Sequence, residues 1–395
     1  MHIAKRLAQV NPSATLAVSQ KTAQMKAAGA DVIDLSVGQP DFTTPKDIAD
    51  AAIASINSGA ASFYTAAAGL PALRQAIADH VATKTGYKYD PKQIVVTDGA
   101  KFALYGIFSA ILDPGDGVLI PIPGWVSYVE QVRLAGGVPQ AVKAANGFKV
   151  TVDDLDAVAN AKTRAIVINS PQNPSGAIYT KQELTLIGNW AVRHDILIVA
   201  DEIYSDLVYN GAECTSMLEL DHSIAENTVL VGGVSKSYAM TGWRIGFIAG
   251  PKKLAQAMST IVSHATGNPA AASQYAAIAA YTGDQKSVES MRQAFEERLN
   301  TIYPLLQAIP GFEFDSKPAG AFYLFPKVSG AVRALGYDST DTFVSALLED
   351  TGVAVVAGRA FGMPDHIRLS YAKSLRIWLK LLRASMHSSH PVFKL

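Results

Sequence analysis

Residues 165–201 read AIVINSPQNPSGAIYTKQELTLIGNWAVRHDILIVAD, and this stretch decides the fold. It begins and ends with short strands, Ala165–Asn169 and Leu197–Asp201, which are apolar almost throughout instead of alternating with polar residues. Such strands are typical of a sheet that is buried on both faces. Between them, Lys181–His194 has a helical pattern. A strand, a helix and a second strand in this order predict a parallel sheet with a covering helix.

The same alternation continues on both sides of this stretch. Further strands and helices are expected at Ile94–Thr97, Ala100–Leu112, Val118–Ile120, Trp125–Ala135, Thr228–Val231 and Ile245–Ala249. We therefore predict an α/β fold, with a three-layer large domain built around a mostly parallel central sheet.

From about residue 285 the pattern changes. A long charged helix is expected over Ser287–Ile309, followed by short strands with helices between them, at Phe312–Phe314, Ala321–Phe325, Val353–Val356 and Ile367–Ser370. These elements predict a smaller α+β domain. The expected divisions are an N-terminal segment (1–44) that packs with the small domain, a large domain (45–285) and the small domain (286–395).

Composition narrows the class of protein. A chain of 395 residues usually needs more than one core, and 49% hydrophobic with 17% charged residues indicates a globular protein. A formal net charge of +0 argues against nucleic-acid binding. The single cysteine, Cys214, excludes a disulfide framework and a multi-cysteine zinc site. Because there is neither a signal-peptide pattern nor an apolar run as long as a membrane span, we expect a cytoplasmic protein without membrane contact.

Polar residues follow four of the expected strands. They stand at Asp98–Lys101, Asn169–Gly176, Asp201–Tyr204 and Gly232–Lys236. Ligands of open α/β sheets bind outside the carboxyl ends of the strands. The four groups should therefore converge on one site.

Lys236 lies in the run Val231–Tyr238, after apolar residues and a glycine pair, with Arg244 eight positions later. Most lysines are solvated surface charges, but this placement indicates an amine at a buried site. Partial desolvation lowers the pKa of an amine and leaves neutral nitrogen that can form an imine. Asp201 ends an apolar strand, where it either caps a helix or faces a cation. We interpret it as the partner of a protonated heteroaromatic nitrogen, with Tyr204 on the same face, within reach of a phenolic oxygen.

The segment Gly99-Ala100-Lys101 opens a helix directly after a strand. Its free backbone N–H groups would suit a phosphate, although an ordinary strand–helix turn has the same pattern. Ser235 and Arg244 would add a hydroxyl and a guanidinium. A P-loop is excluded because Ser235, not glycine, precedes Lys236, and no G-x-G-x-x-G or His-Glu-x-x-His motif is present. A lysine nucleophile, an acidic partner and a phosphate cradle together indicate pyridoxal phosphate and no metal.

In several motifs the sequence resembles the class I/II aminotransferases of the fold-type I pyridoxal-phosphate enzymes, in particular the prokaryotic aspartate aminotransferase-like subgroup. The matching runs span most of the chain in the family's order. They are Leu35–Phe42 (LSVGQPDF), Tyr64–Gly69, Asn169–Gly176, Asp201–Tyr204 (DEIY), Ser235–Gly246 (SKSYAMTGWRIG) and Arg368–Tyr371.

The resemblance implies roles around the cofactor ring. Lys236 would form the Schiff base with pyridoxal phosphate and then carry the proton during catalysis. Asp201 would pair with the pyridine nitrogen, and Tyr204 and Asn173 would donate hydrogen bonds to the ring oxygen. Trp125 would stack on the ring, although an aromatic residue in this position could equally belong to the core.

The resemblance also implies roles around the phosphate. The backbone at Gly99, Ala100 and Lys101, together with Ser235 and Arg244, would hold this group.

The remaining roles concern the substrate and a second subunit. Arg368 would bind the substrate α-carboxylate through two hydrogen bonds, helped by the backbone of Gly38. Tyr64 would reach the phosphate of the neighbouring subunit, which implies a homodimer with shared active sites. Simpler alternatives are a surface ion pair for Arg368 and a loop anchor for Tyr64. Further substrate contacts are expected from Lys101, Trp125 and Asn173.

Lys101 is the main clue to the substrate. In the resembling subgroup a lysine at this point meets the distal carboxylate of the substrate, and Thr15 would line the same pocket. The alternative is that Lys101 only balances the phosphate charge. The prediction is an aminotransferase that moves the amino group of an acidic L-amino acid, with aspartate favoured, to 2-oxoglutarate by a ping-pong mechanism.

Other functions remain open from the sequence. An aromatic, prephenate or glutamate aminotransferase, or a β-lyase, would use the same residues. A transcription regulator built on this fold is disfavoured because no basic helix-turn-helix run precedes the cofactor domain. The end of the chain departs from the family's pattern. Its basic run 372–383 still allows a helix with Leu375, Trp378, Leu379 and Leu382 on one face, whereas residues 387–395 have no clear pattern.

Overall fold

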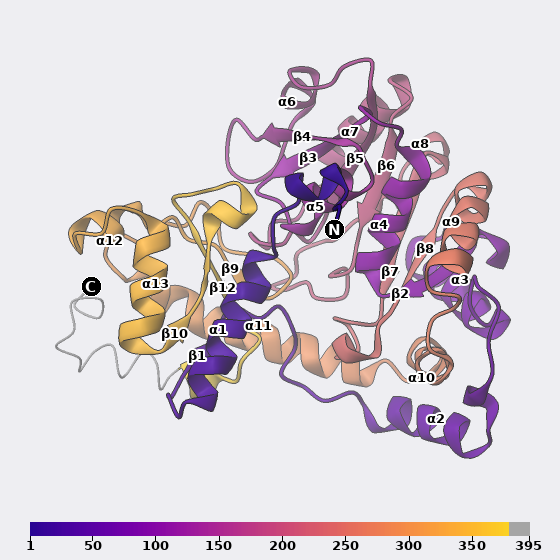
Figure 1. Ribbon diagram of the computed structural model, residues 1–395, viewed down its shortest axis with the longest axis horizontal. Coiled ribbons are helices and arrows are strands. Elements are labelled where there is room, and N and C mark those ends of the chain that lie inside the picture. The colour runs from indigo at the N-terminus through magenta and orange to yellow at the C-terminus, as the bar shows by residue number, and fades with distance from the viewer. Residues whose placement is uncertain (379–395) are drawn as a thin grey trace.

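The computed structural model describes residues 1–378, and a seven-stranded sheet dominates it (Figure 1). All neighbouring strands pair in parallel except β8, which is antiparallel to both of its neighbours. The strand order is β2 (Ile94–Asp98), β8 (Ile245–Ala249), β7 (Thr228–Gly233), β6 (Leu197–Asp201), β5 (Thr163–Asn169), β3 (Gly117–Ile122) and β4 (Val138–Lys143). The predicted mostly parallel sheet is confirmed.

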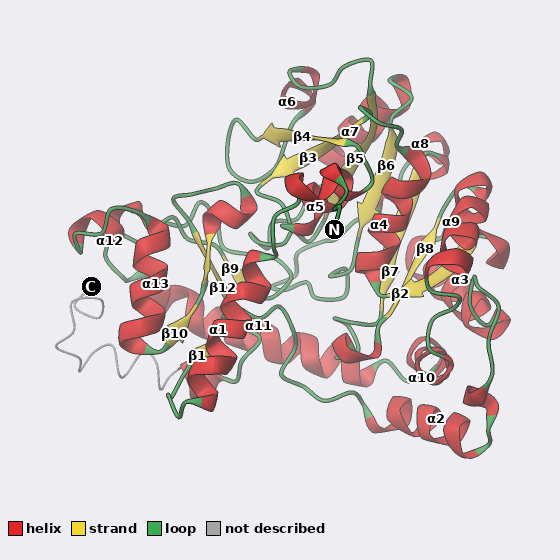
Figure 2. Cartoon of the chain, in the orientation of Figure 1, coloured by secondary structure: helices red, strands yellow, loops and turns green. Residues whose placement is uncertain are grey.

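Helices cover both faces of this sheet, which gives three layers (Figure 2). Within β5, Ile166 and Ile168 pack into one core cluster and Ala165 and Val167 into another, because successive side chains of a strand point to opposite faces. One face packs against α2 (Lys46–Asn57), α3 (Pro71–Thr85), α6 (Val152–Asp156), α7 (Lys181–Arg193), α8 (His222–Glu226) and α10 (Ala271–Thr282). The other packs against α4 (Ala100–Ile111), α5 (Ser127–Leu134) and α9 (Lys252–Ala265).

The edge strand β4 is the one strand of the large sheet that the sequence does not predict. Its residues are mostly exposed or half-buried, with Val142 the one buried residue. An edge strand that buries so few side chains has no apolar run by which the sequence could identify it. Pro139 is tolerated in β4 because an edge strand leaves some of its backbone N–H groups unpaired.

A third core cluster lies beside the large sheet, where the chain builds two small sheets. In one, β1 (Ile33–Asp34) pairs in parallel with β10 (Val353–Ala354). In the other, β11 (Val356–Ala357), β12 (Ile367–Ser370) and β9 (Tyr323–Leu324) are antiparallel. The helices on this side are α1 (Ala14–Ala27), α11 (Lys286–Gln307), α12 (Ser329–Ala334) and α13 (Thr340–Thr351). Elsewhere in the described part of the chain and on this side, short 3-10 helices occur at Lys5–Gln9, Ala60–Ser62, Pro91–Gln93, Met217–Glu219, Thr241–Trp243 and Gly358–Phe361.

Two of the predicted strands need correction. Phe312–Phe314 is not a strand; only an isolated bridge joins Glu313 to Lys327. Val353–Val356 is not one strand but parts of two, because β10 and β11 belong to different sheets.

The domain boundaries at 44/45 and 285/286 stay a prediction. The end of the predicted C-terminal helix, and the tail after it, lie outside the described residues. Within residues 1–378, no helix is both long and apolar enough to span a membrane.

Candidate active site

A cavity of about 280 Å³ lies beyond the carboxyl ends of β5, β6 and β7. Each of the four polar segments that follow strands of the large sheet contributes residues to the lining of this cavity. The predicted site residues that line the cavity are Gly38, Ala100, Lys101, Trp125, Asn173, Asp201, Tyr204, Ser235, Lys236, Arg244 and Arg368, and Thr15 lines it as well. Residues far apart in the sequence therefore meet where the topology predicts.

Lys236 follows β7, and its amine points into this cavity. Its Nζ donates a hydrogen bond of 2.6 Å to the carbonyl oxygen of Gly38 and lies 5.9 Å from the ring centre of Tyr204. Desolvation, followed by the positive charges of Arg368 and Arg244, lowers the pKa of Lys236 to about 7, against the opposing effect of Asp201. About half of such an amine is neutral at pH 7, which makes it a nucleophile.

Asp201 is only 4% exposed at the end of β6. Its Oδ2 accepts a hydrogen bond of 2.6 Å from the hydroxyl of Tyr128, and its Oδ1 accepts one of 3.3 Å from the backbone N–H of Ile203. Burial raises the pKa of Asp201, while these hydrogen bonds and the Lys236 charge oppose that rise. A buried carboxylate held by two donors is suited to meet a cationic ring nitrogen.

The opposite end of the cavity is shaped to receive an anion. Gly99 has φ +81° just before α4, and a Cβ atom there would lie 2.2 Å from Nη2 of Arg244. Arg244, itself at φ +58°, donates to the carbonyl oxygens of Thr241 (3.0 Å) and Asp98 (3.2 Å). Free N–H groups of the helix start and a fixed guanidinium fit a phosphate.

Arg368 lies on β12, only 2% exposed, on the other side of the cavity. Its guanidinium donates to Oδ1 of Asn173 (3.1 Å) and to the carbonyl oxygen of Ser36 (2.6 Å), and it stacks on the ring of Tyr323 at 4.5 Å. Its Nε is buried without a partner among the described residues. Leaving such a charged donor unpaired is costly, which fits a site for a carboxylate.

Lys101 and Trp125 lie together at the α4 side of the cavity, with Nζ 5.0 Å from the indole ring centre. Burial, and then the charge of Arg244, lowers the pKa of Lys101. Tyr64 is different, because it is 97% exposed and does not line the cavity. Within one chain, Tyr64 is therefore not brought to the site.

Two tyrosines that the sequence interpretation missed support the site. Tyr128 binds Asp201 from 73 positions away, and the hydroxyl of Tyr323 lies 2.8 Å from that of Tyr204, 119 positions away. A third missed residue, Asn169, ends β5; its side chain donates to the carbonyl oxygen of Asp201 (2.9 Å) and accepts from the N–H of Asn173 (2.8 Å). Only Asn169 carried a signal, since it opens one of the polar groups that follow a strand.

The residues fit pyridoxal phosphate at three separate points. A nucleophilic amine and a buried carboxylate both line the cavity, as the aldehyde and the ring nitrogen of this cofactor require. The cradle at Gly99 and Arg244 suits the phosphate, and it has no room for even a methyl group at Gly99.

The family model described as aminotransferase class I and II matches residues 30–376. An asparagine–oxo-acid transaminase of Streptococcus mutans is 52% identical over 375 residues, covering 94% of this chain and 95% of the relative. An aspartate aminotransferase of Geobacillus stearothermophilus is 52% identical over 377 residues, covering 95% of each chain. The crystal structure of the aspartate aminotransferase from Rhizobium meliloti superposes with a TM-score of 0.91 at 36% identity, covering 97% of both chains. The chain belongs to the class I and II aminotransferases.

Proposed function

We propose that this aminotransferase moves the amino group of L-aspartate to 2-oxoglutarate in a ping-pong reaction, with pyridoxal phosphate bonded to Lys236. The observation that carries this proposal is the desolvated amine of Lys236, which lines one cavity together with the buried carboxylate of Asp201 and the buried guanidinium of Arg368. The S. mutans relative is named for asparagine and an oxo acid and the G. stearothermophilus relative for aspartate, so these names favour neither a β-lyase nor an aromatic aminotransferase.

Each side chain has a defined task in this proposal. When bound, the cofactor supplies an aldehyde for the amino group and a ring that accepts electrons. Asp201 would keep the ring nitrogen protonated. Once the amino group of the substrate has replaced Lys236 on the cofactor, the freed amine of Lys236 would carry the proton from the substrate Cα to the aldehyde carbon of the cofactor. Arg368 binds the α-carboxylate, which places the Cα–H bond close to Lys236. The guanidinium of Arg244 and the N–H groups at the start of α4 neutralise the phosphate.

Lys101 supports the choice of an acidic substrate. Among the described residues, Lys101 and Lys236 are the two lysines that line the cavity, and Nζ of Lys101 lies over the ring of Trp125. A desolvated cation favours the second carboxylate of aspartate over the neutral amide of asparagine. Since the S. mutans relative is named for asparagine, a comparison of kcat/KM for the two amino acids decides between them.

A homodimer is part of the proposal, with Tyr64 reaching the phosphate in the neighbouring subunit. Tyr64 is 97% exposed, and the large apolar side chains of Ile53, Ile56 and Phe63 are exposed as well. Exposed apolar side chains in such number on one segment are typical of an interface.

A half-reaction tests the proposed function. The holoenzyme is mixed with aspartate in the absence of an oxo acid, and the absorbance of the cofactor is followed. We expect conversion from the aldehyde form to the amine form, with one equivalent of oxaloacetate per site, and reversal by 2-oxoglutarate. Continuous release of ammonia without that conversion would contradict transamination.

A further inference from the structure

The loop of residues 36–42 contacts both functional cations of the site through its backbone. The carbonyl oxygen of Ser36 accepts from Nη2 of Arg368 at 2.6 Å, and that of Gly38 accepts from Nζ of Lys236 at 2.6 Å. The positions of the nucleophilic amine and of the carboxylate-binding guanidinium therefore depend on one loop. Gly38 is, however, the one residue of the motif LSVGQPDF to which a role in the reaction has so far been given.

The start of this loop is fixed by backbone hydrogen bonds. The N–H of Leu35 donates to the carbonyl oxygen of Ala354 (2.9 Å), and the N–H of Ser370 donates to that of Leu35 (2.8 Å). Beyond the loop, Thr44 donates through its hydroxyl to the carbonyl oxygen of Ala239 (3.0 Å). These contacts fix the chain at Leu35 and at Thr44. The loop 36–42 between them must be held in place by side chains.

The far end of the loop is held by an ion pair with α11. Nη1 of Arg298 donates to Oδ1 of Asp41 at 2.8 Å. The guanidinium also lies 5.0 Å from the ring centre of Phe42 and 5.2 Å from that of Phe295, two rings that contact each other edge to face. Arg298 is only 8% exposed. A buried guanidinium that is paired with a carboxylate and lies against two aromatic rings has one favourable place, so it fixes the residues that it contacts.

We propose that Arg298 is a positioning residue for the aminotransferase reaction. Through Asp41 and Phe42 it holds the loop 36–42 so that the carbonyl oxygens of Ser36 and Gly38 stay on Arg368 and Lys236. Arg298 itself does not line the cavity. The inference rests on the proposed function, because it assumes that Arg368 and Lys236 are the groups that bind and convert the substrate.

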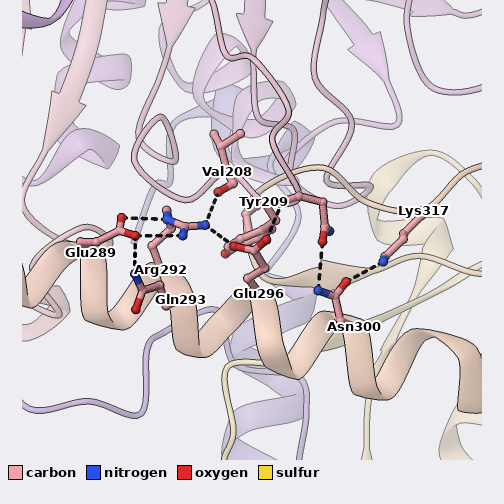
Figure 3. A network of polar contacts seen from close by, with 10 residues as sticks. Val208, Tyr209, Glu289, Arg292, Gln293, Glu296, Asn300 and Lys317 are labelled. Carbon is pink, nitrogen blue, oxygen red and sulfur yellow. Dashed lines mark hydrogen bonds and ion pairs between the residues drawn. The ribbon is translucent and has the colours of Figure 1, made fainter.

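A second arginine of α11 provides a matched control. Arg292 forms ion pairs with Glu289 and Glu296 and donates to the carbonyl oxygen of Val208 (Figure 3). None of these partners belongs to the loop 36–42. Arg292→Met therefore removes an ion-paired guanidinium from the same helix without releasing Asp41. It should lower thermal stability while leaving ligand binding close to that of the wild type.

The experiment measures maleate binding to the holoenzyme, together with kcat and KM for aspartate, in Arg298→Met, Arg298→Lys, Asp41→Ala and the double variant. Maleate carries two carboxylates and no amino group, so its Kd reports on the carboxylate site without catalysis. We expect Arg298→Met to raise the Kd and the KM roughly ten- to a hundredfold, because a misplacement of about 1 Å has effects of that size. Asp41→Ala should have a similar effect. The double variant, Arg298→Met with Asp41→Ala, should bind no more weakly than either single variant, because both substitutions remove the same ion pair. Arg298→Lys should recover most of the affinity.

The outcomes separate the two proposals. If Arg298→Met loses stability as Arg292→Met does, but binds maleate and aspartate like the wild type, Arg298 is merely structural and the inference is wrong. If Arg298→Met does not fold, Asp41→Ala takes its place: binding of maleate and aspartate by Asp41→Ala like that of the wild type would overturn the inference in the same way. A wild-type holoenzyme that neither binds maleate nor converts aspartate would contradict the acidic-substrate proposal instead, and the positioning role would fall with it.

Discussion

Two lysines lie in one cavity and differ in what surrounds them. Lys236 faces Asp201 and donates to Gly38, whereas Lys101 lies beside Trp125, and burial is the largest cause of the lowered pKa of both. Because Asp201 acts electrostatically on the amine of Lys236 and not on that of Lys101, we assign Lys236 to the cofactor and Lys101 to the substrate.

The lowered pKa of Lys236 predicts how cofactor uptake depends on pH. An amine attacks an aldehyde only when it is neutral, and the pKa of about 7 means that the neutral form is lost as pH falls through that value. The rate at which apoprotein takes up pyridoxal phosphate should therefore rise with pH and level off above about pH 7. A stopped-flow series across pH measures this rate. A rate that continues to climb toward the ordinary lysine pKa of about 10.4 would show that the amine is not desolvated.

The role of Lys101 predicts a change in specificity. Replacing it with methionine removes the charge but keeps much of the chain length, so kcat/KM for aspartate should fall roughly ten- to a hundredfold, the usual worth of a charge-assisted hydrogen bond. The kcat/KM for alanine, which has no distal carboxylate, should change little. Steady-state kinetics with both amino acids measure the ratio, and an equal loss for both would mean that Lys101 serves the phosphate.

At the scale of elements, the position of the site could be predicted because β5, β6 and β7 are continuous apolar runs that end in polar residues. Buried parallel strands leave that pattern in the sequence. The partners Tyr128 and Tyr323 could not be predicted, since their contacts join residues 73 and 119 positions apart and depend on how α5 and β9 pack. The short strands beside α11 were also the least predictable, because two-residue strands carry too little pattern.

The turn between β2 and α4 predicts a specific effect of a methyl group. Gly99→Ala would strain a residue at φ +81° and place Cβ against the guanidinium of Arg244, so the Kd for pyridoxal phosphate should rise at least tenfold. Gly86→Ala is the control, because Gly86 also has a positive φ, +75°, but nothing lies within 4 Å of its Cβ position. Both variants should lose about 1 kcal/mol of stability. Equal cofactor affinity in the two would argue against the phosphate cradle at Gly99.

At the scale of the whole molecule, one chain brings together every predicted site residue except Tyr64, with Gly99 at the edge of the cavity. The exposed position of Tyr64 is the one expected if another subunit lies against it. The shared site is therefore a prediction about assembly that a single chain does not test.

Mixed dimers test the shared site. We expect Lys236→Ala and Tyr64→Ala each to be strongly impaired alone. After the two are mixed and allowed to exchange subunits, about half of the dimers are mixed and each of those has one intact site, so activity should recover to about a quarter of the wild type. Activity and molar mass by light scattering are measured on the same samples. Dimers that exchange subunits without any recovery would mean that Tyr64 acts within its own chain or not at all.

The central claim is that Lys236 holds the cofactor, and covalent trapping tests it most directly. The holoenzyme is reduced with borohydride, digested, and the peptides are mapped by mass spectrometry. We predict that the pyridoxyl group is found on Lys236 in the segment Val231–Arg244. A label on Lys101, or on any other lysine with Lys236 unmodified, would contradict the assignment.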